Sequence, residues 1–299
     1  MEQTSYGQLN AHVVGTLMKE AVRRAMVAIR AERFSFEARV KGIGPGGSVD
    51  LVTTADRAAQ RVFVKLLREW FPTFGVVAEE DKLAVPCTEP DRDMWFSVDP
   101  LDGTKAFVRR QSHGIGTMLA LVCDGEVEAA IVGDVMTQEV YTSRPGSDEV
   151  FRISEFGFAE RLVVDAQRPL SEQWLQLRDR ASRHSPLIQE MVNRPNALFE
   201  DYEITGGSIG ISMARLWKGE MAAGVLRPGR SNPWDLCPVV GISKKLGFVF
   251  VEIDAPTRSC QLIPPPVSPE PLVMDREILV LHESRLDELR AWLTGSPAG

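Results

Sequence analysis

The stretch WFSVDPLDGTKAF, residues 95–107, decides how this sequence is interpreted. It begins as an apolar run typical of a buried strand, and it ends in two carboxylates, Asp99 and Asp102, placed around Pro100. Two carboxylates so close together repel each other unless a positive charge lies between them. The stretch therefore predicts a cation site at the end of a strand.

The residues after this strand predict that a helix begins at the same point. Pro100 stiffens the turn, and Gly103-Thr104 allows a tight entry into a helix that begins near Lys105. Unpaired N–H groups at the start of a helix bind phosphate, whereas carboxylates bind a hard cation such as Mg²⁺. In the simpler alternative Asp102 and Thr104 only cap the helix, although a cap needs just one such residue. The combination favours a joint site for a metal ion and a phosphate.

Three further acidic points have ordinary explanations when each is taken alone. They are Glu79 with Glu80 at the end of another strand, Asp56 three residues after Thr53, and Asp235 at the start of a helix. The first could be a solvated acidic loop, the second half of a capping box, and the third an N-cap. One hypothesis explains all of them together with the opening stretch: a cluster of oxygen ligands that holds two or three divalent cations.

The composition is that of an ordinary globular protein. The 299 residues are 44% hydrophobic and 25% charged, which fits one large or two medium domains. The formal charge of -7 argues against a nucleic acid polymer as partner, because proteins that bind one usually carry a basic stripe. No stretch approaches the roughly 20 apolar residues of a membrane span, and the first ten residues lack the pattern of a signal peptide. We therefore expect a cytoplasmic protein without a membrane partner.

The cysteines and histidines argue against a zinc site, a disulfide framework or a covalent nucleophile. The four cysteines are widely separated with no C-x-x-C pair, and the four histidines are equally dispersed. We expect reduced thiols that fill the core. The chemistry must then come mainly from oxygen ligands.

The periodicity along the chain predicts a mixed α and β fold. Helical spacing marks residues 8–31 and a second helix that opens at Thr53 and ends before Pro72, and apolar runs that lead into acid mark strands at 75–81 and 95–99. Between residues 115 and 141 the period becomes two around a turn at 124–125, which predicts an antiparallel meander. Farther on we expect, in order, a strand at 161–167, helices at 171–181 and 211–219, a strand at 221–226, a helix at 235–247 and a strand at 248–253.

This order divides the chain near residue 155. Residues 1–155 form a half of helices and meander that carries most of the predicted ligands, and residues 156–299 form an α/β half with Asp235 and the substrate-side loops. Residues 42–48 predict a flexible turn, and the proline-rich residues 264–269 predict a rigid surface loop.

Four motifs resemble, in their order and separations, those of the inositol monophosphatase family. They are DLVTTAD at 50–56, AEED at 78–81, DPLDGT at 99–104 and NPWD at 232–235. The resemblance spans most of the chain and implies a Mg²⁺-dependent phosphatase that hydrolyses a small-molecule phosphate monoester by metal-activated water attack. It also implies a homodimer and a layered αβαβα sandwich of the type shared with fructose-1,6-bisphosphatase, an α+β or α/β fold.

The same resemblance implies roles for individual residues. The implied metal ligands, for two or three Mg²⁺ per site, are Glu79, Asp99, the Leu101 carbonyl, Asp102 and Asp235. The implied catalytic residues are Thr104 with Asp56, which would orient the water, and Glu79. The implied substrate-binding residues are Gly103 and Thr104, through their amides, with Gly207 and Ser208 close by. Two metal ions suffice for in-line attack without a covalent nucleophile, which agrees with the scarcity of histidine.

A serine hydrolase is the main alternative from another class. Residues 206–210 fit G-x-S-x-G around Ser208, and Asp235 and His282 follow in the order of that class. This alternative leaves the acidic cluster unexplained. A calcium-binding module is a poorer match, because the EF-hand pattern fails at Leu101 and Gly103. A catalytically silent relative that serves as a binding subunit is a third alternative.

The substrate stays open at this point. DPLDGTK followed by Phe107 is similar to the branch that acts on 3'(2'),5'-bisphosphate nucleotides, whereas HGIGTMLAL at 113–121 is similar to histidinol-phosphate phosphatases. The segment before Asp235 lacks the acidic residue with which inositol-specific members bind sugar hydroxyls, and carries Arg227 and Arg230 instead. Guanidinium groups suit a second anionic group on the substrate.

Overall fold

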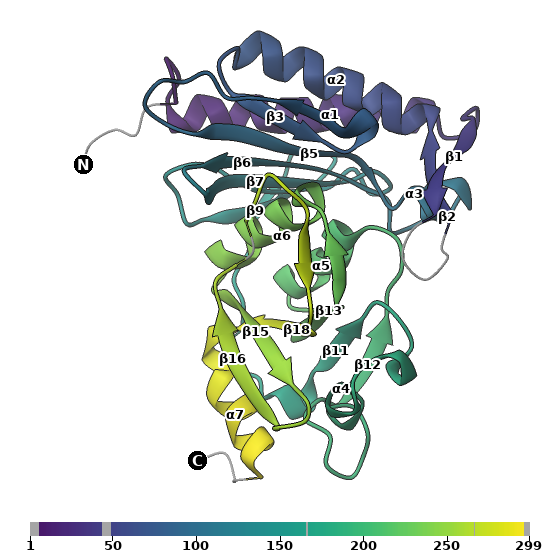
Figure 1. Ribbon diagram of the computed structural model, residues 1–299, viewed down its shortest axis with the longest axis vertical. Helices are drawn as coiled ribbons and strands as arrows, with labels where there is room; N and C mark the ends of the chain where they lie inside the picture. The colour runs from purple at the N-terminus through teal and green to yellow at the C-terminus, as the bar shows by residue number, and fades with distance from the viewer. Residues whose placement is uncertain (1–5, 44–48, 166, 266, 296–299) are drawn as a thin grey trace.

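Five alternating layers of helix and sheet make up the described part of the chain, which is residues 6–43, 49–165, 167–265 and 267–295 of a computed structural model (Figure 1). The outermost layer consists of α1 (Ala11–Ala31) and α2 (Thr54–Trp70). α2 begins as the sequence predicts, because Thr53 and Asp56 form a capping box. Both helices bury their apolar stripes, with Phe63 of α2 among the residues that pack on the first sheet.

The first sheet has eight strands in the order β10-β9-β8-β7-β6-β5-β3-β4. β3 and β5 are parallel, and the other pairs recorded in this sheet are antiparallel, including the predicted meander β6-β7-β8. The strands are β3 (Gly75–Ala78), β4 (Leu83–Val85), β5 (Met94–Asp102), β6 (Gly116–Cys123), β7 (Glu126–Asp134), β8 (Val140–Ser143), β9 (Val150–Ile153) and β10 (Ala159–Arg161). All nine residues of β5 are buried because helices cover the sheet on both faces.

Short elements surround this sheet. β1 (Ala38–Ile43) and β2 (Val49–Thr53) form an antiparallel hairpin beside α3 (Thr104–Val108), and η2 (Glu80–Lys82) joins β3 to β4.

α5 (Ile209–Trp217) and α6 (Pro233–Lys245) form the middle layer between the two sheets (Figure 1). Each uses a glycine to approach the first sheet closely. A Cβ added at Gly210 would lie 2.5 Å from the sulfur of Met118, and one at Gly241 would lie 2.5 Å from Val127. This close packing holds both helices against β6 and β7 of the first sheet.

The second sheet has six strands in the order β12-β11-β13-β18-β15-β16, and α4 (Pro186–Glu190) and α7 (Leu286–Thr294) cover its outer face (Figure 1). The strands are β11 (Trp174–Leu177), β12 (Asp201–Ile204), β13 (Ala223–Leu226), β15 (Phe248–Asp254), β16 (Ser259–Ile263) and β18 (Ile278–His282). The remaining elements are the pair β14 (Gly229–Ser231) and β17 (Leu272–Met274), and the turns η3 (Leu170–Glu172), η4 (Ala181–Arg183) and η5 (Glu283–Arg285).

The layered fold expected from the sequence is confirmed, but two predicted elements are wrong. The helix expected at 171–181 is strand β11, because Leu175 and Leu177 point to one face and pack in the outer core, while the backbone pairs with β12 and β13. The strand expected at 161–167 ends at Arg161, since β10 is a short edge strand from which the chain leaves for the second sheet.

Two predicted loops lie partly outside the described residues: 44–48 of the turn at 42–48, and 266 of the loop at 264–269. In the part of the chain that is described, no helix has the length and apolarity to cross a membrane.

Candidate metal and phosphate site

Three aspartates from two layers converge at the end of β5. Asp99 and Asp102 belong to β5, and Asp235 lies in the first turn of α6. Each offers a carboxylate oxygen, and these oxygens lie within 4.8 Å of one another. Asp99 and Asp102 are buried and Asp235 is half-buried. The structure therefore brings together three of the predicted metal ligands, which are 136 residues apart at most in the sequence.

A bulge in β5 turns both of its aspartates to the same side. Asp99 is opposite Met118 and Asp102 is opposite Gly116, so three steps along β5 match two steps along β6. In a regular strand residues three apart point to opposite faces, and one extra residue cancels that difference. The Leu101 N–H donates to Oδ1 of Asp99 at 3.0 Å and closes the bulge. The bulge within D-P-L-D thus directs the carboxylates of Asp99 and Asp102 to the same side of β5.

The carboxylates of this cluster hold protons more tightly than usual. Burial, with the nearby Glu79 and Asp102, raises the pKa of Asp99 well above its ordinary value. Burial and Asp102 raise the pKa of Asp235 to about 7. Burial is the main cause of both shifts, and the nearby Arg178 lowers the pKa of Asp235 without cancelling the effect of burial. A buried set of carboxylate oxygens fits a hard divalent cation such as Mg²⁺.

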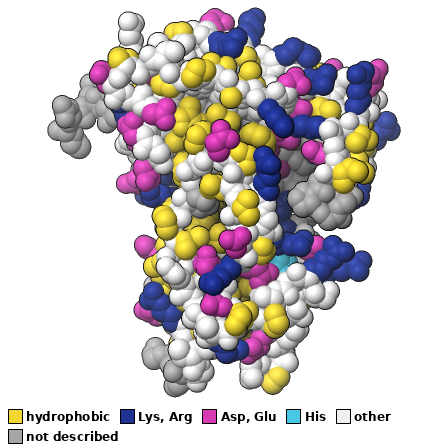
Figure 2. All heavy atoms as spheres, in the orientation of Figure 1, with side chains coloured by type: hydrophobic (Ala, Val, Ile, Leu, Met, Phe, Trp, Pro, Cys, Tyr) yellow, Lys and Arg dark blue, Asp and Glu magenta, His cyan; other side chains and the backbone are white. Residues whose placement is uncertain are grey.

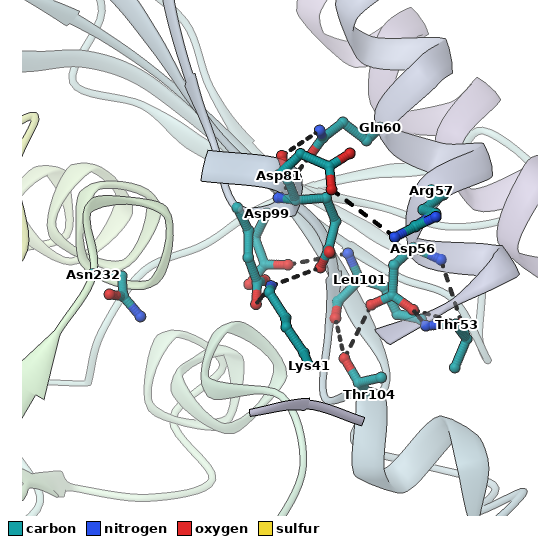
Figure 3. A network of polar contacts seen from close by, with 12 residues as sticks. Lys41, Thr53, Asp56, Arg57, Gln60, Asp81, Asp99, Leu101, Thr104 and Asn232 are labelled. Carbon is teal, nitrogen blue, oxygen red and sulfur yellow. Dashed lines mark hydrogen bonds and ion pairs between the residues drawn. The ribbon is translucent and has the colours of Figure 1, made fainter. Parts of the chain in front are cut away.

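Glu79 lies beside this cluster and is held by Lys41, a lysine that the sequence did not single out. Lys41 lies close to Asp99 (Figure 3). Nζ of Lys41, on β1, lies 3.0 Å from a carboxylate oxygen of Glu79 and 3.0 Å from one of Glu80. Burial raises the pKa of Glu79 to about 8, although Lys41 acts in the opposite direction. The side chain of Gln60 fixes the Glu80 backbone, since it donates to the carbonyl and accepts from the N–H. The hairpin and α2 together set the position of Glu79.

Thr104, Asp56 and Leu101 meet on the other side of the cluster (Figure 3). The Thr104 hydroxyl lies 3.1 Å from Oδ1 of Asp56 and 3.2 Å from the Leu101 carbonyl oxygen, so its single proton is shared between these acceptors. Asp56 is buried, and burial raises its pKa despite hydrogen bonds from Thr53. The two residues proposed to orient a water are therefore in contact.

The side chain of Ser208 holds the carboxylate of Asp102 in place. Its side chain is fully buried, and its hydroxyl donates to Oδ2 of Asp102 at 2.5 Å, where the Gly210 N–H also donates at 2.9 Å. The turn at Gly103 interlocks with this segment. Gly103 has φ of 92°, and a Cβ there would lie 2.3 Å from the Gly114 carbonyl oxygen and 2.7 Å from the Ser208 nitrogen. The start of α5 therefore fixes the direction of the Asp102 carboxylate.

The serine-hydrolase alternative does not match this arrangement. His282 hydrogen-bonds with Ser284 at 2.8 Å and contacts Phe248 edge-on. It lines a small cavity of about 80 Å³, separate from the one that Asp235 lines. Ser208 donates to Asp102, and no histidine among the described residues hydrogen-bonds with its hydroxyl, as a serine nucleophile would need. This alternative is wrong because its three members lie in different surroundings.

Three arginines line a cavity of about 310 Å³ that borders Asp102 and Asp235. Two are the predicted Arg227 and Arg230, both exposed. The third, Arg178 at the end of β11, was missed. Its guanidinium donates to the carbonyls of Gly207 and Ser208 at 2.6 and 3.1 Å and to the Ser212 hydroxyl. It therefore anchors the start of α5 and also faces the cavity.

The two exposed arginines, Arg227 and Arg230, differ in whether they form an ion pair with a neighbouring acidic residue. Arg227 pairs with Asp179 at 2.6 Å, and Asp179 also pairs with Arg183 at 3.2 Å. The side chain of Arg230 makes no ion pair or hydrogen bond with any residue that the structure describes. Gly207, predicted to bind substrate, contributes its carbonyl to Arg178.

The raised pKa values predict how the stability of the metal-free protein depends on pH. The folded state binds more protons than the unfolded chain, so the free energy of unfolding falls as the pH rises from about 4 towards 7, the raised pKa of Asp235. We expect the melting temperature to fall by several degrees over this window, and Mg²⁺ to remove most of the fall.

The variant Asp235→Asn should show a shallower pH dependence without metal, because it removes one of the protons involved. Differential scanning fluorimetry from pH 4 to 8 measures both. An equal slope in wild type and variant would contradict the assignment of Asp235 to the charged cluster.

Comparisons with known proteins agree with the motifs. The model of the inositol monophosphatase family matches residues 11–294. The protein named Nus factor SuhB of Xylella fastidiosa is 30% identical over 224 residues, covering 72% of this chain and 77% of that protein. The Thermotoga maritima protein named fructose-1,6-bisphosphatase/inositol-1-monophosphatase is 29% identical over 209 residues, 69% of this chain and 73% of the relative. Against other SuhB proteins the chain spans only 36% of their length.

A solved structure supports the fold. The structure described as IMPase/NADP phosphatase complexed with NADP and Ca²⁺ superposes with a TM-score of 0.72 at 17% identity, covering 98% of this chain and 99% of that one. The match of the family model over nearly the whole chain, with its motif residues gathered at one point of this fold, shows that the chain belongs to the inositol monophosphatase family.

Proposed function

We propose that this protein is a Mg²⁺-dependent phosphatase that hydrolyses a small-molecule phosphate monoester. The observation that carries the proposal is the cluster of Asp99, Asp102 and Asp235 beside a cavity lined by arginines. The family membership and the phosphatase name of the Thermotoga maritima relative support it.

The metal would be held by Asp99, Asp102, Asp235, Glu79 and the Leu101 carbonyl. Two or three Mg²⁺ ions would, when bound, neutralise the phosphoryl oxygens and make a water more acidic. The residues of the chain then have separate tasks. The Thr104 hydroxyl donates its hydrogen bond to Asp56 and the Leu101 carbonyl, which leaves a lone pair of the Thr104 oxygen free to accept a hydrogen bond from the attacking water. The amides of Gly103 and Thr104, at the start of α3, would donate to the phosphate oxygens.

The arginine cavity favours a substrate with a second anionic group, such as a 3'(2'),5'-bisphosphate nucleotide or a sugar bisphosphate. Three guanidinium groups line about 310 Å³ next to the proposed phosphate site. A guanidinium fork binds phosphate or carboxylate with two parallel hydrogen bonds. Plain inositol 1-phosphate and the cationic histidinol phosphate present no second anion to this cavity. We therefore expect both to be poorer substrates than a bisphosphate.

Arg230→Ala should raise KM for a bisphosphate about tenfold, or about 1.4 kcal/mol, because its unpaired side chain is available to the ligand. Arg227→Ala should have a smaller effect, since Asp179 already holds that side chain. Neither should change the kinetics with p-nitrophenyl phosphate, which has one anionic group. Arg183→Ala is the matched control, because Arg183 also pairs with Asp179 but does not line the cavity. Equal small effects on both substrates would return the monophosphates to first place.

A phosphate-release screen tests the reaction and its substrate. Inositol 1-phosphate, histidinol phosphate, a nucleoside 3',5'-bisphosphate and fructose 1,6-bisphosphate are compared in Mg²⁺. We expect the highest kcat/KM with one of the two bisphosphates. A fluorophosphonate that reacts with active serines should leave the rate unchanged. The absence of release from every compound would favour a binding subunit without catalysis.

We also propose that the protein acts in the cytoplasm as a homodimer. Both are expectations from membership of the inositol monophosphatase family. Light scattering coupled to size exclusion measures the mass in solution, and a value near the 33.1 kDa of one chain would contradict the dimer.

A further inference from the structure

A groove of about 550 Å³ lies along α2, and the function proposed above does not use it. A stripe of four cationic residues of α2 lines one side of it: Arg57, Arg61, Lys65 and Arg68. Val64 and Leu83 add apolar surface to its lining. We call this cavity the basic groove. The four cations are exposed, while Phe63 and Leu67 on the inner side of the same helix are buried. The spacing of four, four and three residues keeps the cations on one side of the helix.

The cations of the basic groove are largely unpaired. Arg57 makes a long ion pair with Asp81 at 3.9 Å. The side chains of Arg61, Lys65 and Arg68 contact no acid or acceptor within the described ranges of the chain. Many other arginines of this protein have an acidic partner, for example Arg152 and Arg215. Lys and Arg side chains gather over the part of the surface where α2 lies (Figure 2). On a chain with a net charge of -7 this stripe is a local site for an anionic ligand.

The length of the stripe points to an extended ligand. Arg57 and Arg68 are eleven residues apart, which is about 16 Å along a helix axis. A single phosphate ester reaches only one or two of the four cations. Successive cations are separated by about 6 Å along the axis, the separation of residues four apart on another helix. A second helix with acidic residues at that spacing therefore matches the stripe.

The other lining residues favour a protein helix over a nucleic acid strand. No aromatic side chain is among the described residues of the basic groove, so bases have no surface on which to stack. Val64 and Leu83 offer apolar contact, which a phosphate backbone does not use. The overall negative charge of the protein repels a long polyanion more than a short helix that brings only a few acidic side chains. Asp81, at the Arg57 end, is exposed and suits a basic residue of the partner.

We propose that the basic groove docks an amphipathic helix of a partner protein. Acidic side chains of that helix, four residues apart, pair with Arg61, Lys65 and Arg68, and a small apolar side chain packs between Val64 and Leu83. A basic residue at one end pairs with Asp81 and sets the direction of the helix.

Fluorescence anisotropy with a labelled peptide tests this docking surface on the full chain. The probe is an 18-residue helical peptide with Glu at every fourth position, one Leu within that stripe and Lys on the opposite face. A scrambled peptide of the same composition is compared with it. We expect the striped peptide to bind at least about tenfold more tightly, equivalent to about 1.4 kcal/mol. Equal binding of the two peptides, or no saturable binding of either, would overturn the proposal.

Charge reversal locates the site. The triple variant Arg61→Glu/Lys65→Glu/Arg68→Glu should bind the striped peptide at least tenfold more weakly than wild type. It should bind a peptide with Lys in the stripe more tightly than wild type does. The single variant Lys65→Glu should show part of the same exchange if the triple variant folds poorly. Arg23→Glu/Arg161→Glu/Arg290→Glu, on α1, β10 and α7, changes the net charge equally and should behave as wild type. Equal losses in the two triple variants, or tighter binding of a single-stranded RNA 12-mer than of the striped peptide, would refute a helix-specific groove.

Discussion

Asp99→Asn is expected to remove nearly all Mg²⁺-dependent phosphate release, by a factor of about a thousand or more. Asp99 is buried at the bulge of β5, and its oxygens lie within 4.8 Å of those of Asp102 and Asp235. Mutation of a residue that hydrogen-bonds to a metal ligand typically lowers metal affinity or activity by about 10- to 100-fold. Mutation of the metal ligand itself should therefore lower activity further. Steady-state phosphate release with increasing Mg²⁺ measures the effect.

The same variant separates a catalytic role from a structural one. Removing one charge from a repelling cluster should leave the melting temperature of the metal-free protein unchanged or higher, because the folded state bears the repulsion. Asp134→Asn is the matched control. Asp134 is a buried aspartate of the same sheet whose pKa burial also raises, and its carboxylate accepts from the N–H groups of Met136 and Thr137. It should retain activity and lose stability, and a sharp loss of stability in Asp99→Asn instead would favour a structural role.

Thr104→Ala is expected to lower kcat about a hundredfold with little change in KM. The Thr104 hydroxyl lies between Asp56 and the Leu101 carbonyl. In that position it can orient a water during attack, and it adds little to the binding of the substrate in the ground state. An interaction made mainly in the transition state affects kcat more than KM. Groups that position or transfer a proton contribute about 10²–10⁴-fold. Initial rates with p-nitrophenyl phosphate give both constants.

Thr104→Ser is the control for this prediction, because it keeps the hydroxyl and loses only a methyl group. It should recover most of kcat. The helix α3 has Gly103 at its N-cap and no side-chain cap, so the Thr104 hydroxyl is not needed there as a cap. An unchanged kcat in Thr104→Ala would remove Thr104 and Asp56 from the mechanism.

The parts of this fold that local chemistry determines could be predicted from the sequence. Thr53 and Asp56 lie within one turn of a helix, and their capping box forms as expected. The bulge between Asp99 and Asp102 is closed by a hydrogen bond within the D-P-L-D stretch, from the Leu101 N–H to Asp99, so part of the site geometry is local. Alternation around residues 124–125 was enough to predict the meander, since each strand shows a period of two.

Residues that act through distant contacts were missed. Arg178 reaches Ser208 and Ser212 only because the end of β11 lies near the start of α5, and Lys41 reaches Glu79 only because β1 comes near the residue that follows β3. Neither has a motif of its own. The helix predicted at 171–181 failed for a related reason. Trp174–Leu177 does alternate, but a run of four residues is too short to outweigh helix-forming neighbours until parallel pairing with β12 fixes it as a strand.

The initial rate of phosphate release from a bisphosphate, measured while Mg²⁺ is returned to EDTA-treated protein, tests the central claim most directly. The claim is that the carboxylates of Asp99, Asp102 and Asp235 act by holding Mg²⁺. The account predicts no release without metal and a saturable recovery with Mg²⁺ that Asp99→Asn lacks. Release that persists in EDTA, or that recovers equally in Asp99→Asn, would contradict it.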